Sequence, residues 1–134
     1  MELDKHRTRG WCAAVGLVAV LGGAAACDDG STSPGAQPGT VTATLTSPNG
    51  PEGAALVEIT APAAQVTQAT GQLYSSTDDS ATQVLIVLDE AGVIRFDLAL
   101  PDIQSRPTYR VLQVSGPDDR LRSDLSGYTL EFTP

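Results

Sequence analysis

The side chains able to do chemistry are few in this 134-residue chain. It has one histidine, His6, and one lysine, Lys5, both within the first ten residues, and two thiols, Cys12 and Cys27. Imidazole and amine groups are the usual general bases, Schiff-base formers and metal ligands of proteins. Because the chain beyond its first residues lacks both groups, we expect no catalytic residue there.

The carboxylates are the remaining reactive groups, and six of those in the segment 41–134 form adjacent pairs at Asp78-Asp79, Asp89-Glu90 and Asp118-Asp119. We expect all three pairs in loops, where their oxygens are potential Ca²⁺ ligands. None has the spacing of a Ca²⁺-binding loop, and acids also favour turns and keep a domain soluble. Two carboxylates can hydrolyse a glycoside, but that reaction needs a cleft usually lined with aromatic rings, and only 4% of the residues are aromatic. We therefore predict no metal and no cofactor, and leave calcium at the acidic loops open.

The charge balance argues against nucleic acid as a partner. The formal net charge is −8, with 8 Lys and Arg against 16 Asp and Glu. Binding to phosphates needs clustered basic side chains, which this composition does not supply. The length fits a single domain with one modest core.

The first 26 residues have the order of a bacterial export signal. Lys5, Arg7 and Arg9 precede an uncharged stretch, Gly10 to Ala26, that is rich in Ala, Val, Leu and Gly. This stretch has 17 residues, fewer than the roughly 20 that a membrane-spanning helix needs. We therefore expect a signal helix over 1–26 that is removed, and a retained membrane helix is the weaker interpretation.

The end of this signal, Ala24-Ala25-Ala26-Cys27, resembles the lipobox of bacterial lipoproteins. In that family small residues precede a cysteine that carries diacylglycerol and becomes the first residue after cleavage. The resemblance implies lipid attachment at Cys27, cleavage after Ala26, and a location in the bacterial cell envelope with the membrane as a partner. It covers only about the first 30 residues and says nothing of the domain that follows.

One feature departs from the family, which usually has Leu where this chain has Ala24. The three alanines also satisfy the rule for ordinary signal peptidase. The alternative is therefore a soluble secreted protein with a free thiol at Cys27. After the signal we expect a flexible, disordered linker over 27–40, because the segment is rich in Gly, Pro, Ser and Thr.

From residue 41 to 134 the apolar residues alternate with polar ones and turn residues interrupt them, which predicts strands. The expected strands are Val41 to Thr46, Ala55 to Thr60, a weak Gln65 to Ser76, Thr82 to Leu88, Val93 to Leu100, Thr108 to Val114, and a last one containing Tyr128, Leu130 and Phe132. Thr82 to Leu88 and Val93 to Leu100 read as a hairpin around Asp89 to Gly92. Val84 to Leu88 is apolar on both faces, as in a central strand covered on each side.

About seven strands in this length predict an all-β fold, a single small antiparallel β-sandwich. The layout loosely resembles immunoglobulin-like or cohesin-like modules, without the Cys and Trp hallmarks of immunoglobulin domains, and an open barrel is the alternative.

We expect a non-catalytic binding or structural module on a lipid anchor, with an envelope protein or a glycan as partner. One alternative is a carbohydrate-binding module with Tyr74 or Tyr109 exposed on a sheet face. Another is an envelope assembly factor that binds through an exposed strand edge.

Overall fold

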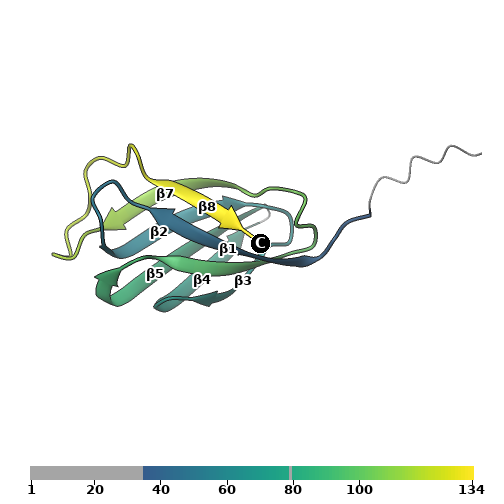
Figure 1. Cartoon of the computed structure of the whole chain (residues 1–134), viewed down its shortest axis with the longest axis horizontal. Helices are drawn as coiled ribbons and strands as arrows, with labels where there is room; N and C mark the ends of the chain where they lie inside the picture. The colour runs from purple at the N-terminus through teal and green to yellow at the C-terminus, as the bar shows by residue number, and fades with distance from the viewer. Residues whose placement is uncertain (1–34, 79) are drawn as a thin grey trace, which may run out of the picture. The chain divides into compact units, whose positions relative to one another are not determined.

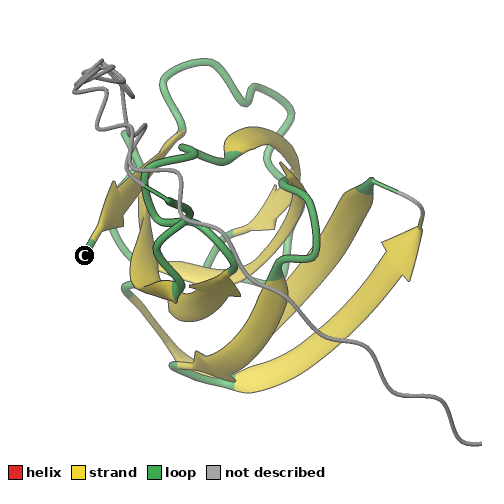
Figure 2. Cartoon of the chain, turned by 90° about the vertical axis from the view of Figure 1, so that its right-hand side faces the viewer, coloured by secondary structure: helices red, strands yellow, loops and turns green. Residues whose placement is uncertain are grey.

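The computed structural model describes residues 35–78 and 80–134. The predicted signal peptide 1–26 with Ala24, Ala25 and Ala26, the predicted lipid site Cys27, the linker up to residue 34, and Asp79 lie outside the described residues. The regular secondary structure within the described ranges consists of β-strands, and these ranges contain no helix (Figure 2). No helix in these ranges is long and apolar enough to cross a bilayer.

The described residues form eight strands. They are β1 (Gly39–Thr46), β2 (Glu52–Thr60), β3 (Gln65–Ala69), β4 (Gln72–Asp78), β5 (Ala81–Gly92), β6 (Arg95–Leu100), β7 (Thr108–Ser115) and β8 (Thr129–Thr133). From the sequence we predicted about seven strands, because Gln65 to Ser76 was counted as one weak strand. That segment is two strands, β3 and β4, which meet at Gly71. A Cβ at Gly71 would collide with the backbone carbonyl of Val87, so glycine lets the chain pass close to β5 there.

The strands build two four-stranded antiparallel sheets that pack as a sandwich (Figure 1). Sheet A has the order β3-β6-β1-β8, and sheet B has the order β4-β5-β2-β7. The prediction of an all-β antiparallel sandwich is therefore confirmed for the described residues. Four of the strand pairs are nested in sequence, as in one long hairpin whose two arms turn together from one sheet to the other. They are β1–β8, β2–β7, β3–β6 and β4–β5.

The hairpin predicted between Thr82 to Leu88 and Val93 to Leu100 is wrong. β5 pairs with β2 and β4 in sheet B, whereas β6 pairs with β1 and β3 in sheet A. The expected turn, Asp89 to Gly92, continues β5, and Gly92 lies opposite Glu52 of β2. The chain crosses between the sheets only after Gly92, where the Ile94 carbonyl accepts a hydrogen bond from the Leu45 amide at 2.9 Å.

The core lies between the sheets and follows the period-two pattern of the strands. Its buried side chains include Val41, Ala43 and Leu45 of β1, Ala55, Val57 and Ile59 of β2, Val84 and Ile86 of β5, and Phe96, Leu98 and Leu100 of β6. Burying each of the larger aliphatic or aromatic side chains contributes about 1.5–3 kcal/mol to folding. The inward positions predicted at Tyr128 and Leu130 are also buried, while Phe132 is half-buried.

The sandwich has two distinct ends. At the entry end, β1 begins opposite the end of β6, and Gln37 just before β1 is hydrogen-bonded to the loop after β6. The Ile103 amide donates to the Gln37 carbonyl at 2.8 Å, so this part of the predicted linker is fixed to the domain. β1 itself begins at Gly39, two residues before the predicted domain start. At the far end, β1 and β7 finish and β2 begins (Figure 1).

Candidate functional site

The far end holds a buried carboxylate, Glu52, whose burial no sequence pattern predicted. A β-bulge between Glu52 and Ala54 shifts the register of β2 against β5. Without it, the alternation of β2 would turn Glu52 toward solvent with Ala54 and Leu56. With it, Glu52 is 1% exposed.

Four hydrogen bonds satisfy this carboxylate. Oε1 accepts from the Ser47 hydroxyl at 2.6 Å and from the Tyr128 hydroxyl at 2.5 Å. Oε2 accepts from Nε and Nη2 of Arg122 at 3.1 and 3.0 Å. Arg122 and Glu52 therefore also form an ion pair. The side-chain amide (Nδ2) of Asn49 donates to the Tyr128 hydroxyl at 2.8 Å. We call these five residues, Ser47, Asn49, Glu52, Arg122 and Tyr128, the Glu52 cluster.

The electrostatics of the cluster keep Glu52 ionised. Desolvation by burial would raise the pKa of Glu52, but hydrogen bonds from Ser47, Tyr128 and Arg122 and the Arg122 charge outweigh it. The pKa of Glu52 therefore lies below its ordinary value. The hydrogen bond from Arg122 to Glu52 in turn raises the pKa of the guanidinium. A carboxylate held ionised with every lone pair occupied is a poor general acid or base, so the cluster's role is structural.

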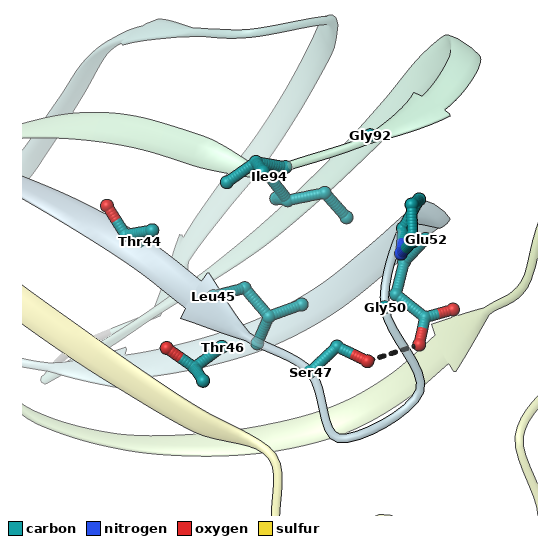
Figure 3. Close-up of a pocket in the computed structure, with 10 residues that line it drawn as sticks. Thr44, Leu45, Thr46, Ser47, Gly50, Glu52, Gly92 and Ile94 are labelled. Atoms are coloured by element: carbon teal, nitrogen blue, oxygen red, sulfur yellow. Dashed lines mark hydrogen bonds between the residues drawn. The ribbon is translucent and has the colours of Figure 1, made fainter.

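A cavity of about 400 Å³ adjoins the cluster between the β1–β2 turn and the β5–β6 connection. Leu45 and Ile94 line it, and Ser47, which also lines it, donates a hydrogen bond to Glu52 (Figure 3). Its size falls within the range of ligand pockets, and its wall is mainly apolar. No buried side-chain polar atom of the described residues lacks a hydrogen-bond partner. Because its wall is mainly apolar, the cavity can receive a small apolar group.

The outer face of sheet B presents apolar side chains to solvent. Register places Tyr74, Leu85 and Leu56 side by side across β4, β5 and β2, and Val87 lies two residues further along β5. Leu121 shares a shallow hollow with Leu56 and Leu85. Tyr74 is 57% and Leu121 65% exposed. We call Leu56, Tyr74, Leu85, Val87 and Leu121 the outer patch.

The outer face of sheet A is polar by contrast. Thr42 and Thr44 of β1 lie opposite Asp97 and Arg95 of β6, and Thr44 lies opposite Glu131 of β8. The Thr42 hydroxyl bonds Asp97 at 2.8 Å. β5 is central in its sheet, as predicted, but no described residue forms a second layer over its Leu85 and Val87. The contrast marks the outer patch as the candidate binding surface.

The predicted contact tyrosines lie on opposite faces of sheet B. Tyr74 lies outward, and its hydroxyl donates to Gln72 at 3.1 Å. Tyr109 pairs with the buried Ile59, and its ring meets Phe132 edge-on with centroids 6.0 Å apart. Tyr109 therefore closes the gap between the sheets, and of the two only Tyr74 is available as a surface contact.

The acidic pairs do not converge. Asp78 lies at the entry end, where Ala81 pairs with it and Thr60. Asp89-Glu90 lies within β5 near the far end, not in a loop, and Asp118-Asp119 follows β7 at the far end. Among residues 35–78 and 80–134, no three acids, cysteines or histidines are close enough to hold a metal ion.

Three arginines of the last third of the chain each pair with a different acid. Arg110 pairs with Glu58 at 3.7 Å and Arg120 with Asp118 at 3.8 Å, both at the surface. Arg122 pairs with Glu52 instead of a neighbouring aspartate.

Comparison of the chain with protein-family models, curated proteins and solved structures found no match.

Proposed function

We propose that this chain is an exported, lipid-anchored protein of the bacterial cell envelope whose β-sandwich is a non-catalytic binding module. The sequence Ala24-Ala25-Ala26-Cys27 after a basic and then apolar N-terminus supports the anchor. The outer patch carries the binding role, since it is an apolar surface on a domain whose other sheet face is polar. Its partner in this proposal is an envelope protein.

The anchor is tested by detergent phase partition of the full chain expressed with its own N-terminus. The expected result is that the wild type enters the detergent phase and the Cys27→Ser variant stays in the aqueous phase. Equal partition of both would leave the soluble secreted alternative, with an unmodified Cys27.

The outer patch is tested by placing a photoreactive amino acid at Leu121 in cells. Leu121 is exposed, so the replacement leaves the core intact. The matched control carries the same amino acid at Thr129, an exposed position on sheet A. Adducts of defined mass at Leu121 and none at Thr129 support the patch. Adducts at both positions or at neither refute it.

A second candidate is a carbohydrate-binding module, favoured by the exposed ring of Tyr74 with the polar Gln72 beside it. Sugar rings stack on aromatic faces, and amide groups bind their hydroxyls. Binding on a glycan array that disappears in Tyr74→Ala and persists in Tyr109→Phe supports this function. Absence of any glycan binding by the wild type refutes it.

An immunoglobulin-like arrangement is a finer proposal for the sandwich. Two packed antiparallel sheets in about 95 residues support it, since immunoglobulin domains have this architecture and about 100 residues. The strand order differs in two respects. β1 and β2 lie in different sheets, whereas the first two strands of an immunoglobulin domain share one, and β7 lies beside β2 in sheet B, whereas the seventh strand of an immunoglobulin domain shares a sheet with the third and sixth.

A further inference from the structure

Three of the four strand edges of the sandwich carry features that hinder pairing with another strand. The register of β3 shifts between Val66 and Gln68, and that of β7 shifts opposite Leu56 and Val57. β8 has only five residues, with Glu131 in the middle. Bulges, short length and charges are the usual protections of exposed edges.

β4 lacks all three protections. It has seven residues and pairs with β5 without interruption from Gln72 opposite Val87 to Asp78 opposite Ala81. It contains no charged residue before Asp78 and no proline. The hydroxyls of the paired Thr77 and Thr82 lie 3.1 Å apart, as in the closer, non-hydrogen-bonded pairs of an antiparallel ladder. Antiparallel alternation then turns the backbone N–H and C=O groups of Leu73, Ser75 and Thr77 to the free edge.

The sequence of β4 is complementary to itself in an antiparallel arrangement. With Ser75 opposite the Ser75 of a second copy, Tyr74 lies opposite Ser76 and Leu73 opposite Thr77. Gln72 then lies opposite Asp78, so no two like charges face each other. The two Tyr74 rings become diagonal neighbours, a separation that aromatic side chains can bridge.

The charge of the chain makes this edge the favoured place for self-association. Two copies with a net charge of −8 each repel one another over most of their surfaces. The corresponding pairing of β8 would place Glu131 opposite its own copy. A pairing of β7 centred on Val111 would make the two Arg110 side chains diagonal neighbours. β4 has both an uncharged central stretch and an uninterrupted row of free backbone donors and acceptors.

We propose that two copies of this chain pair through β4, antiparallel about a two-fold axis at Ser75, and join their B sheets into one eight-stranded sheet. The outer patches of both copies then lie on one continuous face. This pairing needs no lipid anchor, so its failure would leave the proposed envelope function standing.

A single strand pairing buries less surface than a standard protein interface, so we expect a weak dimer with a Kd between about 1 µM and 1 mM. The test is sedimentation velocity of the full chain in a mild non-ionic detergent, from about 1 µM to about 1 mM, a range that spans this Kd. The expected result is a shift from monomer to dimer over this range. A wild-type chain that stays monomeric over the whole range overturns the proposal. That result would also be expected if a different protein pairs with the β4 edge.

Two variants locate the contact. Ser75→Lys places two ammonium groups opposite each other at the axis, and the expected result is loss of the dimer. Thr129→Lys adds the same charge at the β8 edge, and the expected result is dimerisation at least as strong as in the wild type. Equal loss in both variants refutes a contact at β4.

Mixing provides the check on register and on folding. The Ser75→Lys and Ser75→Glu variants are each expected to be monomeric alone and to form a mixed dimer when combined, because the axis then joins opposite charges. Since a misfolded variant would not be rescued by mixing, a mixed dimer also shows that both variants fold. No dimer on mixing would refute pairing centred on Ser75.

Discussion

Replacing Glu52 by Gln tests whether the Glu52 cluster holds the far end together. The replacement keeps the size of the side chain and an acceptor for the Ser47 and Tyr128 hydroxyls, but it places an NH₂ group against the two donors of Arg122. The charge that strengthened all four hydrogen bonds is also lost.

The magnitude follows from the burial of Glu52. Hydrogen bonds to a charged group contribute about 1.5–3 kcal/mol each, and leaving buried partners mismatched adds to the loss. We expect the free energy of unfolding to fall by about 2–4 kcal/mol, out of the roughly 5–15 kcal/mol typical of a domain. For a domain of this size that corresponds to a Tm lower by about 10–25 °C.

The assay is urea unfolding of the full chain at pH 7, with Glu58→Gln as the matched control. Glu58 undergoes the same chemical change, but its partner Arg110 is 76% exposed, and surface ion pairs contribute about 0–1 kcal/mol. A loss at Glu52 no larger than at Glu58 would show that the cluster does not stabilise the fold.

The stabilisation by Glu52 depends on pH in a defined direction. Because the pKa of Glu52 is lowered in the folded state, the stabilisation is complete above its ordinary value of 4.5 and is lost as the pH falls through the lower folded value. The difference in stability between the wild type and Glu52→Gln is therefore expected to shrink below about pH 4.5. A difference that stays constant down to pH 2 would contradict the assignment.

Two substitutions test the fold itself. Gly71→Ala is expected to destabilise the domain by about 1–3 kcal/mol through collision with the Val87 carbonyl, whereas Gly35→Ala, where a Cβ meets nothing within 4 Å, is expected to change little; equal effects in thermal unfolding would contradict the close approach. Ile86→Ala is expected to cost about 2–5 kcal/mol by leaving a cavity in the core, and a loss below 1 kcal/mol would place Ile86 outside the packed core.

The strands were predictable wherever one face of the strand is buried and the other face is exposed to solvent. Val41, Ala43 and Leu45 alternate with threonines, and the structure buries the first set, because a strand shows successive side chains to opposite faces. The same logic located Leu98 and Leu130 in the core.

Connections between sheets were not predictable, because their signals are not local. Asp89 to Gly92 has turn-forming residues, yet it continues β5, since pairing with Glu52 outweighs its turn preference. Glu52 itself was missed because a bulge reverses its direction, and its partners Arg122 and Tyr128 lie 70 and 76 residues away. One feature of the sequence indicated the outer patch, namely that Val84 to Leu88 has apolar residues on both faces of the strand.

The measurement that bears most directly on the proposed function is the mass of the N-terminal peptide of the full chain, expressed with its own signal in a bacterial host. The expected result is a peptide that begins at Cys27 and carries diacylglycerol, which directs the search for a partner of the outer patch to the membrane. An unmodified peptide beginning at Cys27, or one retaining residues 1–26, would contradict the lipid anchor.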